Sequence, residues 1–135
     1  MTLVVDTSAM MAILLGEPEV SEFVPILRAS TTTVISAGNV IELYRVMQAR
    51  AGPQRWDDVD HLLDLYGIVV VPVDRPQLLL AKDGMRRFGL GRGTPPAVLN
   101  FGDLFAYALA RSIPAPLLFK GDDFGRTDVT PAWTP

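Results

Sequence analysis

Short apolar runs alternate with longer segments of mixed polarity along most of the chain. The runs are rich in aliphatic and β-branched residues, as strands are, and cover residues 3–5, 31–36, 67–73 and 116–120. Those at 3–5 and 67–73 are continuously apolar, which is typical of parallel strands buried on both faces. Helices are expected over residues 8–15, 37–51, 54–66, 76–88 and 101–111, and one more has Pro18 in its first turn. This alternation predicts an α/β fold with a mostly parallel central sheet.

Polar residues mark where several of these helices begin. Ser36, Asp74 and Asn100 each precede a predicted helix, and each side chain can accept a hydrogen bond from the free N–H groups of the first turn. Residues 89–100 contain three Gly and two Pro, which predicts a loop. Residues 127–129 are expected to add a short edge strand.

The composition is that of a folded domain. A chain of 135 residues suits one domain, residues 1–135, and 49% of it is hydrophobic while 20% is charged. The net charge of −3 argues against a generally basic surface for nucleic acid, although it leaves room for a local basic patch. The absence of Cys excludes disulfides and thiolate metal sites. Since the apolar segment 10–15 is too short to span a bilayer, we expect a cytoplasmic protein without membrane attachment.

Acidic side chains occur where a parallel sheet would place functional groups, beyond the carboxyl ends of its strands. Asp6 follows the first predicted strand, and Asp122 and Asp123 follow the last. Glu42 lies in the helix after the second strand, and Asp103 lies in the first turn of the helix at 101–111. Each also has a purely structural interpretation, as a helix cap, a solvated helix residue, a capping-box acid or a turn residue.

The combination of these acids favours a metal site. Two carboxylates about 4 Å apart repel by roughly 4 kcal/mol at an effective dielectric constant of 20, so a cluster must take up protons or bind a cation. Oxygen ligands without Cys favour Mg²⁺ or Mn²⁺. The only His, His61, lies in a polar helix away from these acids and is expected at the surface.

Four segments together resemble the PIN-domain proteins, and within them the VapC toxins of bacterial toxin–antitoxin operons. The segments are VVDTSA at the start, ISAGNVIEL, NFGDLFAYALA, and LLFKGDDFGRTDV near the end. They occur in the order and spacing of that family and cover nearly the whole chain. The resemblance implies a PIN-like α/β/α sandwich and a metal-dependent ribonuclease.

The resemblance also implies which residues carry the chemistry. The catalytic and metal-binding acids would be Asp6, Glu42, Asp103 and Asp122. Either Asp122 or Asp123 fits the fourth position, and we prefer Asp122 because Asp123 precedes Phe124, which should pack inward. Thr7 and Ser8 match hydroxyl positions of the family and would hold Asp6 or bind phosphate.

The implied reaction is hydrolysis of RNA phosphodiester bonds with bound Mg²⁺, for which Mn²⁺ is an alternative. The implied partners are the RNA substrate, a cognate VapB-type antitoxin and a second copy of the chain in a homodimer. Candidate contacts to the RNA backbone are the basic residues Arg86, Arg87, Arg92, Lys120 and Arg126.

Two other classes of protein would use these acids differently. An aspartyl phosphotransferase would use Asp6 as its nucleophile, but such enzymes commonly carry a second Asp two residues later, where this chain has Ser8. A catalytically inactive PIN-like binding module is the other alternative, and no acidic position in this chain is lost. A metal-binding assay and a nuclease assay distinguish the three.

Overall fold

Four parallel strands form the centre of the part of the chain that the structure describes. The computed structural model describes residues 1–92, 95 and 98–135. The strands are β1 (Thr2–Val5), β2 (Thr32–Ser36), β3 (Val69–Val71) and β4 (Leu117–Leu118). They lie in the order β3-β2-β1-β4, and Val4 is opposite both Val34 and Leu117. The predicted parallel sheet is therefore confirmed.

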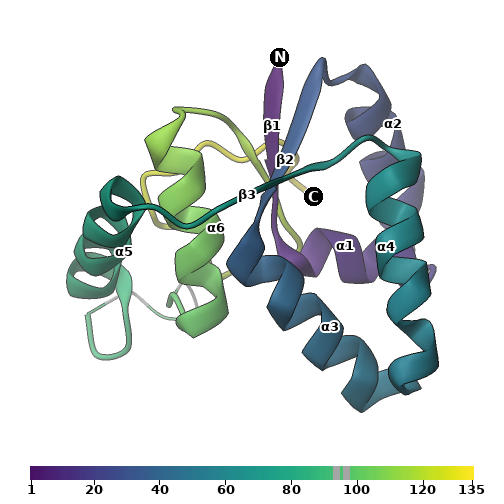
Figure 1. Ribbon diagram of the computed structural model, residues 1–135. Coiled ribbons are helices and arrows are strands. Elements are labelled where there is room, and N and C mark those ends of the chain that lie inside the picture. Colours follow the sequence, from purple (N-terminus) through teal and green to yellow (C-terminus); the bar gives the residue numbers. More distant parts are fainter. Residues whose placement is uncertain (93–94, 96–97) are drawn as a thin grey trace.

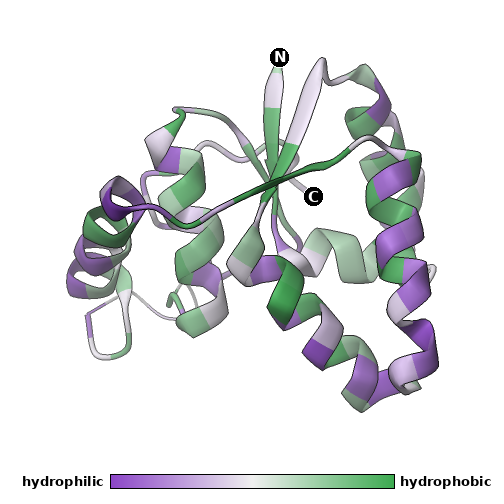
Figure 2. Cartoon of the chain, viewed as in Figure 1, coloured by the Kyte–Doolittle hydropathy of each residue, from purple (hydrophilic) through white to green (hydrophobic). Residues whose placement is uncertain are grey.

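Helices cover both faces of this sheet and make a three-layer α/β/α sandwich (Figure 1). One layer contains α1 (Thr7–Leu14), α2 (Val20–Ala29), α3 (Ala37–Ala51), the 3₁₀ turn η1 (Pro53–Arg55) and α4 (Trp56–Leu65). The other contains α5 (Arg75–Phe88) and α6 (Phe101–Ser112). Side chains alternate along β1, so Leu3 and Val5 pack with the first layer and Val4 packs with the second. The strands are accordingly apolar in Figure 2, and polar residues lie on the outer sides of the helices.

The predicted helix caps are present. Ser36, Asp74 and Asn100 each accept a hydrogen bond from a backbone N–H in the first turn of the next helix. The expected position of Pro18 is wrong, because α2 begins only at Val20 and Pro18 lies in the preceding turn. The caps at Ser36 and Asn100 begin the helices that carry Glu42 and Asp103.

A buried strand was predicted at residues 67–73; a strand is present there, but its predicted burial is wrong. Only Val69–Val71 form a strand, and the side chains of Val69 and Val70 are 52% and 43% exposed. β3 lies at one edge of the sheet, and Val69 and Val70 lack the cover that Leu117 and Leu118 of the opposite edge strand, β4, have at 0% exposure.

The C-terminal segment also differs from the prediction. Residues 127–129 form bends and not a strand, and the chain instead makes an isolated parallel bridge between Leu117 and Pro131. Within the predicted loop 89–100, residues 93–94 and 96–97 lie outside the described residues. No helix in the described part of the chain is long and apolar enough to cross a membrane.

Candidate active site

The carboxyl ends of β1, β2 and β4 bring the predicted acids to one edge of the sheet. Asp6 directly follows β1 and caps α1, and Glu42 lies in the second turn of α3, which follows β2. Asp103 lies in the first turn of α6, where it completes a capping box with Asn100. Asp123 lies in the segment that follows β4. Three strand ends and two helix starts thus define the site.

Hydrogen bonds with Ser8 and with residues 118–120 after β4 hold Asp6 in place. It is 3% exposed, and its Oδ2 atom accepts hydrogen bonds from the Ser8 N–H (3.0 Å) and the Ser8 hydroxyl (2.6 Å). The Ser8 Oγ atom in turn accepts from the Lys120 N–H (2.9 Å), and the Asp6 N–H donates to the Leu118 carbonyl (3.0 Å). Ser8 therefore holds Asp6, one of its two expected roles.

The second carboxylate oxygen of Asp6 has no such support. Its Oδ1 atom is buried and makes no hydrogen bond. Buried polar atoms are nearly always paired, because leaving one without a partner costs about 1–3 kcal/mol. An unpaired carboxylate oxygen among other acids is therefore where a cation would find a ligand.

Asn39 joins Glu42 to the start of α6. Its side chain is fully buried, and the amide donates to the Glu42 Oε1 atom (3.3 Å) and to the Gly102 carbonyl (3.0 Å). The Thr7 hydroxyl donates to the Asn39 carbonyl (3.3 Å), so it braces α3. Gly102 leaves room for the Glu42 carboxylate where it lies, because a Cβ atom at this position would overlap that group. The sequence analysis missed both Asn39 and Gly102.

Burial and repulsion from neighbouring carboxylates raise the pKa values of Asp6 and Asp103. Burial raises the pKa of Asp6 to about 6, hydrogen bonds from Ser8 oppose that rise, and the charge of Glu42 adds to it. Burial also raises the pKa of Asp103 to about 8, with further contributions from the Asp6 charge and from a hydrogen bond and charge repulsion with Asp123. These effects link Glu42, Asp6, Asp103 and Asp123 as electrostatic neighbours.

Of the two adjacent acids after β4, Asp123 is the one that faces Asp103. Its carboxyl group is half-buried and close enough to Asp103 to raise the pKa of that group. Asp122 is exposed and lines a different hollow with Trp133. Phe124 is buried as expected, yet its burial does not turn Asp123 away from the site.

The acids have the chemistry of a site for a hard cation, but their side chains do not converge on one point. Within residues 1–92, 95 and 98–135, no three acidic, His or Cys side chains are grouped closely enough to hold an ion as they stand. The donors are all carboxylates, and the unpaired Asp6 Oδ1 supplies a free ligand atom. These residues therefore fit Mg²⁺ or Mn²⁺ better than a soft metal.

The candidate RNA-binding cations differ in whether they form ion pairs with acidic side chains of the protein. Lys120 is engaged, with its Nζ atom 2.7 Å from Glu17 and 3.1 Å from Glu19. Arg86 and Arg87 both pair with Asp83 on their own helix, while Arg92 and Arg126 are exposed. His61 is exposed on α4, as expected.

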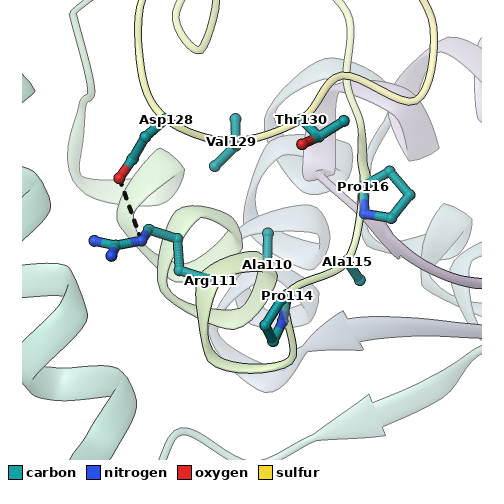
Figure 3. Close-up of a pocket in the computed structure, with 8 residues that line it drawn as sticks. All are labelled: Ala110, Arg111, Pro114, Ala115, Pro116, Asp128, Val129 and Thr130. Atoms are coloured by element: carbon teal, nitrogen blue, oxygen red, sulfur yellow. Dashed lines mark ion pairs between the residues drawn. The ribbon is translucent and has the colours of Figure 1, made fainter.

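A polar hollow of about 370 Å³ at the far end of α6 lies outside this site (Figure 3). Arg111 and Asp128 form an ion pair there, with 3.4 Å between Nε and Oδ2. Arg111 comes eight positions after Asp103, which is about 12 Å along a helix axis. The hollow therefore lies at the end of α6 opposite the acids.

The fold and the strand-end acids define the PIN class of proteins. The chain belongs to the PIN-domain family, whose model matches residues 3–129. It is 46% identical to ribonuclease VapC42 of Mycobacterium tuberculosis over 132 residues, which cover 98% of this chain and 100% of that protein. The sequence-based resemblance is confirmed.

Solved structures share the fold. The crystal structure of VapC20 from Mycobacterium tuberculosis matches 98% of this chain and 99% of its own, with a TM-score of 0.76 at 15% identity. That of VapBC2 from Rickettsia felis, bound to a DNA fragment from its promoter, matches 97% of this chain and 96% of its own, with a TM-score of 0.75 at 13% identity. At such identities these matches support the α/β/α sandwich alone.

Proposed function

We propose that the chain is a metal-dependent ribonuclease that acts as the toxin of a VapBC toxin–antitoxin pair. Identity of 46% to a protein named ribonuclease VapC42, along the whole length of both chains, supports this function. Residues 1–135 act as one domain, since the two layers of helices pack on a single sheet. An aspartyl phosphotransferase is disfavoured, because Ser8 occupies the position of the second Asp and serves as a hydrogen-bond donor to Asp6.

The observation that carries the proposal is the buried, unpaired Oδ1 atom of Asp6, which has Glu42 and Asp103 as electrostatic neighbours, with Asp123 next to Asp103. Asp6, Glu42, Asp103 and Asp123 would hold Mg²⁺, or Mn²⁺ in its place, and Asp123 replaces Asp122 in this assignment. When bound, the ion lowers the pKa of a water molecule and stabilises negative charge on the phosphate.

The side chains around the acids keep them in position. The two hydrogen bonds from Ser8 fix the Asp6 carboxylate, and the Asn39 amide orients Glu42. Because Asp6 and Asp103 keep protons more readily than exposed acids do, cation binding displaces those protons. Metal affinity should therefore rise with pH.

Chelation tests the proposed function directly. The purified protein should cut single-stranded RNA in the presence of Mg²⁺, lose this activity in EDTA and recover it when Mg²⁺ or Mn²⁺ is restored in excess. The products can be followed by gel electrophoresis of end-labelled RNA. Cleavage that persists in EDTA at the original rate would contradict the metal-dependent mechanism.

Two matched substitutions test the fourth acid. Asp123→Asn should weaken Mn²⁺ binding by about tenfold or more, because Asp123 lies near enough to Asp103 to raise its pKa. Asp122 is exposed, so Asp122→Asn should bind Mn²⁺ almost as the unaltered protein does. Calorimetric titration of Mn²⁺ into both variants measures the difference. Equal losses, or a larger loss in Asp122→Asn, would reject the assignment of Asp123.

We further propose that the protein works in the cytoplasm as a homodimer and is inhibited by a VapB-type antitoxin. An Arg-bearing antitoxin segment would complement the acidic site through charge-assisted hydrogen bonds. The solved VapBC2 complex of Rickettsia felis supports such a partner, and the exposed valines of edge strand β3 offer apolar surface for self-association. Light scattering of the purified protein should give the mass of a dimer, and a monomer at every accessible concentration would contradict it.

A further inference from the structure

A largely apolar hollow of about 370 Å³ lies beside the acids, between the first turns of α3 and α6. Ile41 of α3 and Phe101 and Phe105 of α6 provide its apolar walls, while Glu42 and Arg45 add one charge of each sign. Glu42 belongs to both the hollow and the acidic site. A group bound in the hollow would therefore lie next to the reacting phosphate.

The hollow is preformed by close packing of the two helices. Gly38 of α3 lies so near the Phe105 ring that a Cβ atom would overlap it, and Gly102 has the same relation to the Glu42 carboxylate. The centroids of the Phe101 and Phe105 rings are 5.2 Å apart, and the ring planes make an angle of 78°. This edge-to-face contact orients Phe101.

Phe101 and Ile41 are nevertheless largely in solvent. Their side chains are 77% and 70% exposed, and Arg45 beside them is also exposed. An aromatic ring next to an Arg on an otherwise acidic edge suits an unpaired nucleobase, because the ring stacks on the base and the guanidinium pairs with the backbone phosphate. Arg45 would also offset repulsion between the RNA backbone and the carboxylates.

We propose that this hollow binds one unpaired base of single-stranded RNA adjacent to the phosphodiester that is cut. Phe101 stacks on the base, Ile41 and Phe105 line its other sides, and Arg45 contacts a neighbouring phosphate. The inference rests on the proposed ribonuclease function and adds to it a requirement for unpaired RNA at the cleavage site. Phe101 is a substrate-binding residue in this proposal, since its ring contacts the base and not the reacting phosphate.

Steady-state cleavage of a 20-nucleotide single-stranded RNA of mixed sequence tests this inference. Phe101→Ala should raise KM by about tenfold, the loss expected for one stacked base, with kcat little changed. Phe101→Trp should keep the original KM, because its ring can stack. Leu65→Ala removes an apolar side chain that is 61% exposed on α4, outside the hollow, and should leave both constants unchanged.

Two further measurements separate the possible failures. An unchanged KM in Phe101→Ala, or an equal rise in Leu65→Ala, overturns the base-binding role while leaving the ribonuclease intact. Loss of a dimer in Phe101→Ala, measured by light scattering, also overturns it, because the hollow would then be covered by a second copy of the chain. If the unaltered protein with Mg²⁺ does not cut this RNA at all, the ribonuclease function fails and the inference fails with it.

Discussion

Replacing Asp6 by Asn is expected to reduce RNA cleavage by at least about a hundredfold, a loss of transition-state stabilisation near 3 kcal/mol. Asn keeps the shape of the side chain and can still accept the hydrogen bonds from Ser8 that cap α1. It removes the negative charge, and with it a ligand that Mg²⁺ requires in near-ideal geometry. The measurement is kcat/KM on a labelled single-stranded RNA, with circular dichroism to confirm that the variant is folded.

The same variant should be more stable than the unaltered protein when no metal is present. The Asp6 carboxyl has a pKa of about 6 in the folded protein and 3.8 as its ordinary value, so the folded state keeps a proton that the unfolded chain releases. The free energy of unfolding therefore falls as the pH rises from about 4 to about 6, by an amount on the order of 2 kcal/mol. Asn does not titrate and escapes this loss.

Thermal melting in EDTA at several pH values checks the stability effect. The melting temperature of Asp6→Asn should exceed that of the unaltered protein at pH 7, and the difference should shrink towards pH 4. Added Mg²⁺ should raise the melting temperature of the unaltered protein more than that of the variant. If Asp6→Asn instead unfolds or cuts RNA at the original rate, Asp6 acts as a helix cap and not as a metal ligand.

Adding one methyl group at Gly102 should also inactivate the enzyme without unfolding it. In Gly102→Ala the new Cβ overlaps the Glu42 carboxylate, which lies at the end of a flexible side chain and can move away. The helix itself tolerates Ala better than Gly. Because small displacements of catalytic groups can lower rates by up to about a hundredfold, we expect kcat/KM to fall by at least about tenfold with an unchanged or higher melting temperature.

The double variant Glu42→Ala/Gly102→Ala is the control for this mechanism. Without the Glu42 carboxylate the added methyl group displaces nothing, so the double variant should be no less active than Glu42→Ala alone. If Gly102→Ala lowers activity by the same factor in both backgrounds, its effect does not pass through Glu42.

Local sequence patterns were sufficient for the layers of the fold but not for the position of each strand in the sheet. Short apolar runs rich in β-branched residues, together with the caps at Ser36, Asp74 and Asn100, predicted the alternation of strands and helices correctly. They could not predict that β3 is an edge strand, because strand order depends on contacts between distant segments. Its valines look the same in the sequence whether they are covered or exposed.

The same limit applies to the candidate site: its local features could be predicted from the sequence, but not how they are arranged in space. The positions of Asp6, Asp122 and Asp123 beyond strand ends could be predicted from their neighbours in the chain, but which of Asp122 and Asp123 lies near Asp103 could not. The preference for Asp122 relied on Phe124 packing inward, which it does. Residues 122–125 form a turn closed by a hydrogen bond from the Gly125 N–H to the Asp122 carbonyl (3.0 Å), and in this turn the inward packing of Phe124 does not turn Asp123 away from Asp103.

The role of Asn39 could not be predicted from its neighbours in the chain, for a related reason. Its amide contacts the Gly102 carbonyl across 63 positions of sequence, so its role exists only once α3 and α6 have packed. The available signal in the sequence was the spacing, since Asn39 precedes Glu42 by three residues and therefore lies on the same face of the helix.

The hydrogen bond between Ser8 and the Lys120 N–H has a consequence for the order in which the enzyme forms. It joins groups 112 positions apart, and the neighbouring bond from the Asp6 N–H to Leu118 closes a loop of similar length. Contacts between residues so far apart in the sequence form late in folding, because the chain must first lose the conformational entropy of closing a long loop. Until β4 joins β1, Ser8 lacks its hydrogen bond from the Lys120 N–H and Asp6 lacks its bond to Leu118. The active site is thus completed late in folding, after the layers that carry its other acids can already have formed.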